Sequence, residues 1–135
     1  MKKFEYKFFV QYADTDKMGY VYYANYYVWF EAARTDFLRK AGYPYKVMEA
    51  EQIMLPVAES HCKHYAPAFF EDDIIIELWI SELKNVSLKI SYNVIRENDN
   101  KLLATGYTVH SSINNKGKLI RLPEKFINVI KPYVE

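Results

Sequence analysis

The chain has few of the features that direct a protein to a membrane, a nucleic acid or an oxidising compartment. Its one cysteine, Cys62, excludes an internal disulfide and fits a reducing compartment. No window approaches the ~20 apolar residues that span a bilayer. No long apolar run follows Lys2 and Lys3, so we expect no secretory signal. With 18 basic and 17 acidic residues, the net charge of +1 gives no general attraction to nucleic acid. These absences predict a cytoplasmic protein.

The length and composition are those of one globular unit. A chain of 135 residues fits a single domain over residues 1–135. It can bury roughly 68% of its unfolded surface, so its core needs no metal or disulfide. Aromatic residues make up 17% of the chain, mainly as 13 tyrosines and 8 phenylalanines. Tyrosine is common at interfaces and in ligand pockets, although composition alone favours a tyrosine-rich core and surface.

The first half of the chain predicts a strand and a long helix. Residues 4–10 have the pattern of a strand, and residues 24–41 that of an amphipathic helix. The apolar helix positions recur at three- and four-residue spacing at Tyr26, Trp29, Phe30, Ala33, Phe37 and Ala41. We expect Asn25 to cap the start of this helix and Gly42 to lie just past its end. Asp36 and Lys40 can pair across one turn, and a short helix is expected at 44–51.

The second half predicts an antiparallel sheet. Strands are expected at residues 56–65, 72–82, 86–97, 101–113 and 118–121, followed by a helix at 123–131. The segment 86–97 alternates apolar and polar residues, which is typical of a half-buried antiparallel strand. The order of one strand, a long helix and a run of strands favours an α+β fold. Because the far face and the edges of such a sheet need cover, we also expect an oligomer.

Asp14 and Asp16 are the first candidate functional residues. They lie with Gly19 in a turn-like segment directly before the predicted long helix. A helix N-terminus offers unpaired N–H groups and the positive end of a dipole, which can polarise a carbonyl beside a carboxylate. Such an arrangement suits attack on an acyl group. Aspartate is also frequent in turns because it caps local amides, and chemistry alone favours that structural role.

The same stretch resembles a known family. The sequence Asp-Thr-Asp-Lys-Met-Gly-Tyr-Val-Tyr-Tyr-Ala-Asn-Tyr, followed by Phe30, Glu31 and Arg34, is similar to the signature of hotdog-fold acyl-CoA thioesterases. The closest branch is the 4-hydroxybenzoyl-CoA thioesterase type, including thioesterases associated with the Tol-Pal system. The resemblance continues through the Tyr-Ala-Pro-Ala run at residues 65–68 and Arg-Leu-Pro at 121–123. It implies a hotdog fold, in which a sheet of about five antiparallel strands wraps a long central helix.

The resemblance also implies roles for individual residues. Asp16 is the expected catalytic carboxylate, and Asp14 a structural turn former. The backbone N–H of Tyr23 is expected to polarise the thioester carbonyl, with the Tyr23 side chain near the acyl group. Asp16 either attacks the carbonyl to form a mixed anhydride or acts as the base for water, and the sequence leaves both routes open. The other aromatic residues that could line an acyl pocket are expected in the core: Tyr20, Tyr22, Tyr26, Tyr27 and Trp29.

Coenzyme A carries phosphates that need basic contacts. Lys84 is the leading candidate because it precedes Asn85-Val86-Ser87, a region where the family often contacts the nucleotide. Lys89, Arg96 and Arg121 are lesser candidates.

A second cluster, His61, Cys62 and His64, invites a metal or nucleophile interpretation. On a strand Cys62 and His64 share one face while His61 points away. This spacing disfavours a three-ligand metal site and leaves a Cys–His pair without an evident acidic partner. We therefore expect a strand near the pocket or a subunit interface, and a structural role for His110.

The sequence thus predicts an acyl-CoA thioesterase that releases a carboxylic acid and Coenzyme A without a metal or redox cofactor. The resemblance implies a homodimer with the active site at the subunit boundary, or a homotetramer built from two dimers. Two alternatives stay open. One is a thioesterase that acts on acyl carrier protein, and the other is a non-catalytic module that binds acyl-CoA.

Overall fold

The fold was analysed in a computed structural model that describes all residues from Met1 to Glu135. The N-terminal half contains β1 (Phe4–Phe9), a 3-10 turn η1 (Tyr12–Asp14), α1 (Asn25–Ala41), α2 (Tyr45–Ala50) and β2 (Ile53–Met54). The C-terminal half contains β3 (Val57–His64), β4 (Asp73–Leu83), β5 (Ser87–Arg96), β6 (Lys101–Ser111), β7 (Ile113–Asn114), α3 (Glu124–Ile130) and η2 (Lys131–Tyr133).

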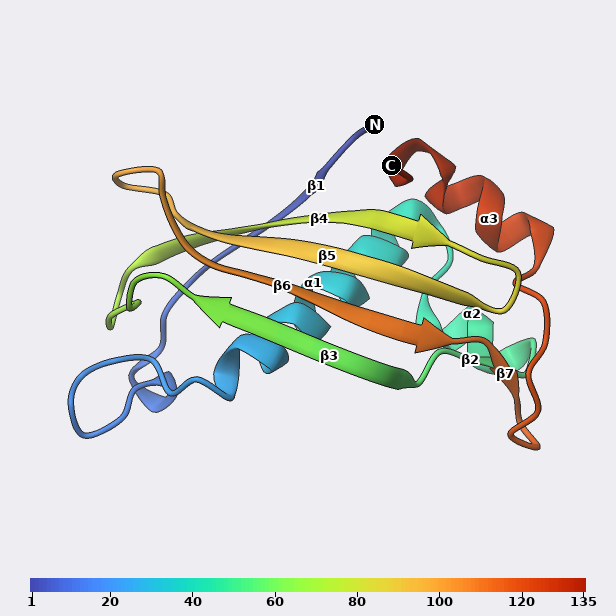
Figure 1. Cartoon of the computed structure of the whole chain (residues 1–135), viewed down its shortest axis with the longest axis horizontal. Helices are drawn as coiled ribbons and strands as arrows, with labels where there is room; N and C mark the ends of the chain where they lie inside the picture. Colours follow the sequence, from blue (N-terminus) through green and yellow to red (C-terminus); the bar gives the residue numbers. More distant parts are fainter.

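Five strands form one antiparallel sheet, and α1 lies against one of its faces (Figure 1). The strand order is β1-β4-β5-β6-β3, and every neighbouring pair is antiparallel. The predicted hairpin is confirmed, since β5 pairs with β6 from Ser87 opposite Ser111 to Arg96 opposite Lys101. The predicted alternation is also confirmed, because Leu88, Ile90, Tyr92 and Val94 are buried and the residues between them are not. This arrangement confirms the expected α+β fold with a central helix on a five-stranded sheet.

The helix approaches the sheet most closely at Phe30. The Phe30 ring stacks on Tyr92 of β5 with centroids 4.2 Å apart and planes 9° from parallel. On β6 the same ring lies over Gly106, where a Cβ atom would be 2.6 Å from the Phe30 ring carbons. Only glycine leaves room for this contact. The predicted apolar stripe of α1 therefore packs on the sheet, with Tyr26, Trp29, Phe30, Ala33 and Phe37 buried.

The ends of α1 agree only partly with expectation. Gly42 adopts the left-handed conformation with φ +94°, and Lys40 pairs with Asp36 at 3.0 Å, as predicted. Asn25 is not the N-cap, because it is the first helical residue and Ala24 occupies the cap. The Asn25 side chain instead donates from Nδ2 to the backbone oxygen of Asp14 at 2.8 Å. A tertiary contact has thus replaced the local cap.

The strand expected at residues 118–121 does not form. Only Leu119 makes a single bridge, to Ile113. The partner of Ile113–Asn114 is β2 (Ile53–Met54), a two-residue strand that periodicity did not predict. Because such a strand is too short to show alternation, its pairing depends on tertiary contacts. None of the helices is long and apolar enough to cross a bilayer.

A chain of buried polar groups connects α1 to the sheet. The Arg34 guanidinium donates from Nη1 to the Tyr92 hydroxyl at 3.2 Å, and this hydroxyl lies 2.8 Å from Oγ1 of Thr108. His110 Nε2 lies 2.8 Å from the same Thr108 oxygen, and His110 Nδ1 lies 2.9 Å from the backbone oxygen of Leu55. His110 is 1% exposed, so the structural role expected for it is confirmed.

Burial of His110 predicts a loss of stability in acid. Burial, assisted by the Arg34 charge, lowers the pKa of His110 from 6.5 to about 4 against the opposing effect of the Leu55 carbonyl. Between these two pH values His110 is protonated in the unfolded chain but not in the folded one. The contribution of neutral His110 to the stability of the fold is therefore complete above pH 6.5 and falls as the pH drops towards 4. The difference between the two pKa values corresponds to about 3 kcal/mol in the free energy of unfolding.

Denaturant unfolding between pH 6.5 and 4 tests this account. The free energy of unfolding should fall less steeply with decreasing pH for His110→Asn than for the wild type. His61→Asn, which removes an exposed imidazole, should keep the wild-type slope, and equal slopes for all three proteins would contradict this account.

Candidate active site

Asp16 lies in the loop between η1 and α1, with its side chain exposed. Its Oδ1 atom accepts hydrogen bonds from the backbone N–H groups of Met18 at 2.9 Å and Tyr20 at 3.2 Å. A tight turn, in which Gly19 has φ +83° and donates to the Asp16 backbone oxygen at 3.0 Å, brings these amides to the carboxylate. The Oδ2 atom has no hydrogen-bond partner within the chain. One oxygen of Asp16 is therefore held by the backbone, and the other has no partner in the chain.

Asp14 is bound into the local structure instead. Its Oδ2 atom accepts the backbone N–H of Gln11 at 3.0 Å and closes the turn η1. Its backbone oxygen accepts the N–H of Tyr22 at 2.9 Å as well as the Asn25 side chain. The side chain is half-buried. These contacts give Asp14 the geometry of a turn former. Each aspartate keeps one carboxylate oxygen without a partner, but only Asp16 lines the cavity described below.

The amides before α1 are not equivalent. The N–H of Tyr22 is used by Asp14, whereas the N–H of Tyr23 donates to no atom of the chain. Tyr23 lies two residues before the first helical residue, Asn25, where the helix dipole presents its positive end. The Tyr23 amide is therefore an available donor for a carbonyl oxygen.

Asp16 and Tyr23 line one open cavity of about 480 Å³. Most of its wall is aromatic or apolar, and the other lining residues are Tyr20, Val21, Tyr22, Tyr26, His64, Tyr65, Ala66 and Pro67. The Tyr23 side chain is 63% exposed and packs beside Tyr22 with ring centroids 4.9 Å apart. The cavity thus combines a carboxylate, an unbonded amide and an apolar wall, which suits the binding of an acyl group.

The expectation that the other aromatic residues lie in the core is only partly correct. Trp29 and Tyr26 are buried, although Tyr26 also contributes to the cavity wall. Tyr20 and Tyr22 are 39% and 48% exposed, so a core position for them is wrong. Both precede α1 in a loop, where the helical spacing used to predict burial does not apply.

The strand that carries His64 was expected near the pocket or a subunit interface, and both His64 and Tyr65 line the cavity. His64 is the last residue of β3, and its ring meets Tyr26 edge-on with centroids 4.5 Å apart. Partial burial lowers the pKa of His64, which favours the neutral imidazole. The Tyr-Ala-Pro-Ala run that begins at Tyr65 was a usable signal, because its first three residues line the cavity. Its last residue, Ala68, accepts the Val21 N–H on its backbone oxygen at 2.9 Å.

The remaining members of the histidine and cysteine cluster have other environments. His61 stacks on Tyr107 with centroids 5.2 Å apart. Burial raises the pKa of the Cys62 thiol to about 11, so the thiol stays protonated and is a poor nucleophile. No group of three or more His, Cys, Asp and Glu side chains is placed to hold a metal ion.

Lys84 is not brought together with Asp16 in one chain. It follows the last residue of β4, whereas the loop before α1 and the end of β3, which contribute residues to the cavity, lie at the other end of the sheet (Figure 1). The 11 residues of β4 span roughly 35 Å at about 3.3 Å per residue. Lys84 forms an exposed ion pair with Glu82 at 2.8 Å. Another candidate for phosphate contacts, Arg96, is engaged by Asp99 and Asp72.

Comparison with known proteins identifies relatives over almost the whole chain. Residues 10–130 match the family model described as the thioesterase-like superfamily. The acyl-CoA thioester hydrolase YbgC of Escherichia coli O6:H1 is 33% identical over 94 residues, covering 70% of this chain and 69% of that protein.

Solved structures share the fold. A hypothetical protein from Aquifex aeolicus, AQ1494, superimposes with a TM-score of 0.89 at 31% identity, covering 94% of this chain and 98% of that one. The gentisyl-coenzyme A thioesterase BH1999 superimposes with a TM-score of 0.82 at 32% identity, covering 89% of this chain and 96% of that one.

Proposed function

The chain belongs to the thioesterase-like superfamily of hotdog-fold thioester hydrolases, and we propose that it hydrolyses an acyl-CoA thioester to a carboxylic acid and Coenzyme A. The observation that carries this proposal is one cavity lined by both Asp16, whose Oδ2 has no partner, and Tyr23, whose N–H donates to no atom of the chain. The names of relatives such as YbgC and the gentisyl-coenzyme A thioesterase support a CoA thioester as the substrate. We assign residues 1–135 to a single thioesterase domain.

Asp16 is the proposed catalytic carboxylate. In one route Oδ2 attacks the thioester carbon, the C–S bond breaks and the Coenzyme A thiolate leaves. Water then hydrolyses the mixed anhydride and regenerates the carboxylate. In the other route Asp16 removes a proton from the water that attacks the carbonyl. Both routes use the same free oxygen, and the amides of Met18 and Tyr20 hold the carboxylate in place through Oδ1.

The Tyr23 amide is the proposed donor to the carbonyl oxygen. As the carbonyl carbon becomes tetrahedral, negative charge develops on this oxygen, and a fixed N–H at the positive end of α1 stabilises it. One donor of this kind contributes about 10²–10³ in rate. Tyr23 also presents its ring to the acyl group from the cavity wall.

A thiol-release assay over short, long and aromatic acyl-CoAs tests the activity. Turnover of at least one of these substrates is expected. If only acyl carrier protein thioesters are cleaved, the substrate assignment is wrong. If acyl-CoA binds without turnover, the protein is a binding module and the catalytic proposal is wrong.

The variant Asp16→Asn tests the role of the carboxylate. The substitution keeps size and removes charge, so kcat should fall by at least ~10² while the fold stays intact. Steady-state kinetics with circular dichroism measure both effects. Asp14→Asn is the matched control, and it should lower stability while turnover is retained, because Asp14 caps the turn η1. Near-normal turnover in Asp16→Asn would show that the wrong aspartate was chosen.

We also propose a homodimer in which two sheets join along β3, with a homotetramer built from two such dimers. β3 is an edge of the sheet, and all of its residues except Cys62 are exposed. An unpaired, exposed edge strand is a template for pairing. Because His64 at the end of β3 lines the cavity, a partner paired along β3 would border the active site. The single, partly buried Cys62 supports a cytoplasmic location.

Light scattering after gel filtration tests the assembly. The chain has a mass of 16.0 kDa, and we expect a species of two or four times this value. A monomer of 16.0 kDa at micromolar concentration would contradict the proposal.

Lys84 is the proposed contact for the Coenzyme A phosphates. Because it lies far from the cavity of its own chain, we propose that it serves the site at the subunit boundary. Its ammonium group is 66% exposed and lies on a flexible side chain, which suits contact with a phosphate.

The variant Lys84→Gln should raise KM about tenfold with kcat unchanged, because it removes binding that is equal in the ground and transition states. Lys116→Gln, which changes an exposed lysine in the turn after β7, is the matched control and should keep the wild-type KM. Equal KM values for Lys84→Gln and the control would remove Lys84 from the binding site.

A further inference from the structure

The loop that carries Asp16 is held at both ends by one short turn, residues 69–72. At the entry to the loop, the Val10 N–H donates to the Asp72 oxygen at 2.9 Å, and the Glu71 N–H donates to the Val10 oxygen at 3.0 Å. At the exit, Tyr20 forms an antiparallel bridge with Phe69, and their rings pack with centroids 5.4 Å apart. The position of the turn therefore sets the position of the loop.

The exit contact continues directly to the Asp16 carboxylate. Tyr20 accepts the Asp16 N–H on its backbone oxygen at 2.7 Å and donates its own N–H to Asp16 Oδ1 at 3.2 Å. Phe69 thus contacts Tyr20, and the Tyr20 amide in turn holds the Asp16 carboxylate. A displacement of Phe69 would move Tyr20 and with it the hydrogen bonds to the carboxylate.

The turn itself has an unfavourable backbone. Its third residue, Glu71, has φ +67°, a conformation that usually requires glycine or asparagine. The Asp72 N–H closes the turn on the Phe69 oxygen at 3.1 Å. A strained conformation of this kind persists only where surrounding contacts maintain it.

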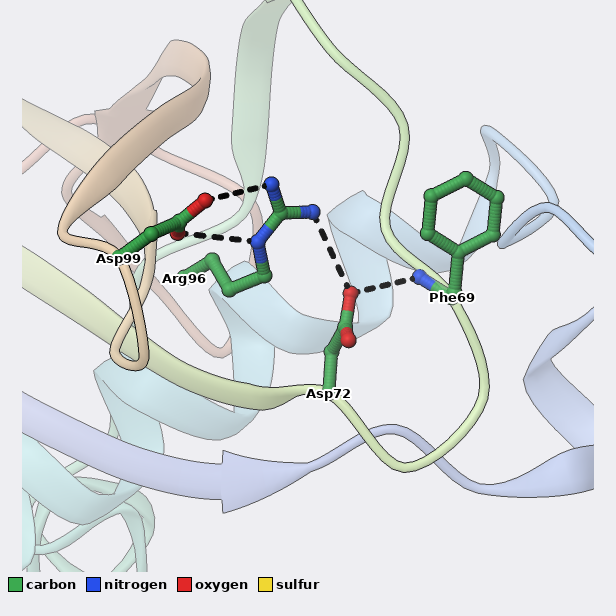
Figure 2. Close-up of polar contacts among 4 residues, drawn as sticks. All are labelled: Phe69, Asp72, Arg96 and Asp99. Carbon is green, nitrogen blue, oxygen red and sulfur yellow. Dashed lines mark hydrogen bonds and ion pairs between the residues drawn. The ribbon is translucent and has the colours of Figure 1, made fainter.

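Those contacts come from Asp72 and Arg96. The Asp72 Oδ2 atom accepts the Phe69 N–H at 2.9 Å and lies 3.6 Å from Arg96 Nη1 (Figure 2). Asp99 fixes the guanidinium from the other side, through Nε at 3.0 Å and Nη2 at 2.9 Å. The Arg96 and Asp72 side chains are only 18% and 22% exposed. No other ion pair of the chain has two partners this little exposed.

We propose that Asp72, held by Arg96, is the positioning residue for catalysis by Asp16. Its carboxylate fixes the 69–72 turn, the turn fixes Tyr20, and the Tyr20 amide holds the Asp16 carboxylate with its free oxygen directed to the substrate. Arg96 therefore acts in loop positioning and does not contact a phosphate. This inference rests on the proposed thioesterase function, and it adds residues that touch neither the substrate nor Asp16.

The variants Asp72→Ala and Asp72→Asn test the proposal. Asp72→Ala removes both the bond to Phe69 and the ion pair, so kcat should fall by ~10-fold or more while KM changes less than about twofold. Asp72→Asn keeps an acceptor for the Phe69 N–H and loses only the ion pair with Arg96. Its kcat should therefore lie between those of the wild type and Asp72→Ala, and should equal that of Arg96→Gln.

Asp36→Asn is the matched control, because Asp36 is 21% exposed and forms an ion pair on α1 away from the cavity. It should leave kcat unchanged. A general loss of stability would lower activity only in proportion to the folded fraction.

Amide hydrogen exchange provides a readout that does not require activity. In folded Asp72→Asn the Tyr20 and Met18 amides should exchange faster than in the wild type, while amides in the centre of β5 keep their rates. Wild-type exchange at Tyr20 and Met18, or a kcat equal to that of the wild type, would overturn the proposal. If the wild type cleaves no thioester, the proposed function fails and hydrogen exchange still decides whether Asp72 holds the loop.

Discussion

The close approach of α1 to the sheet at Gly106 is the contact on which the rest of the structure depends. Phe30 stacks on Tyr92 and covers the bare backbone of Gly106, where any Cβ atom would be 2.6 Å from the ring. A larger residue on β6 would force the helix away from the sheet. Because the N-terminus of α1 lies beside the cavity, the depth of this contact also sets where the helix presents its amides.

Some polar groups at the start of α1 form hydrogen bonds within the loop, and others have no partner in the chain. The Tyr22 amide, the Asn25 side chain and the carboxylate of Asp14 are all used to fold the loop. The Tyr23 amide and one oxygen of Asp16 are left without partners. Satisfying the first set of groups is what keeps the second set fixed and available, since a loop with unsatisfied polar groups of its own would rearrange.

The two ends of the sheet have different tasks in the proposed enzyme. At one end, the 69–72 turn and the β5–β6 turn meet through Arg96 and fix the catalytic loop. At the other end, Lys84 extends into solvent beside Glu82. The proposed dimer along β3 assigns the features at both ends of the sheet to one substrate site.

Periodicity and turn residues determined most of the secondary structure, because α1 and strands β3 to β6 are long enough to show their periods. The family signature singled out Asp16 and Tyr23, and both line the cavity. Tertiary contacts decided the rest. The pairing of β2 with β7, the exposure of Tyr20 and Tyr22, and the placement of His64 and Tyr65 at the cavity arise from segments far apart in the chain. Local sequence cannot specify such contacts, because hydrogen bonds and burial depend on which segments the fold brings together.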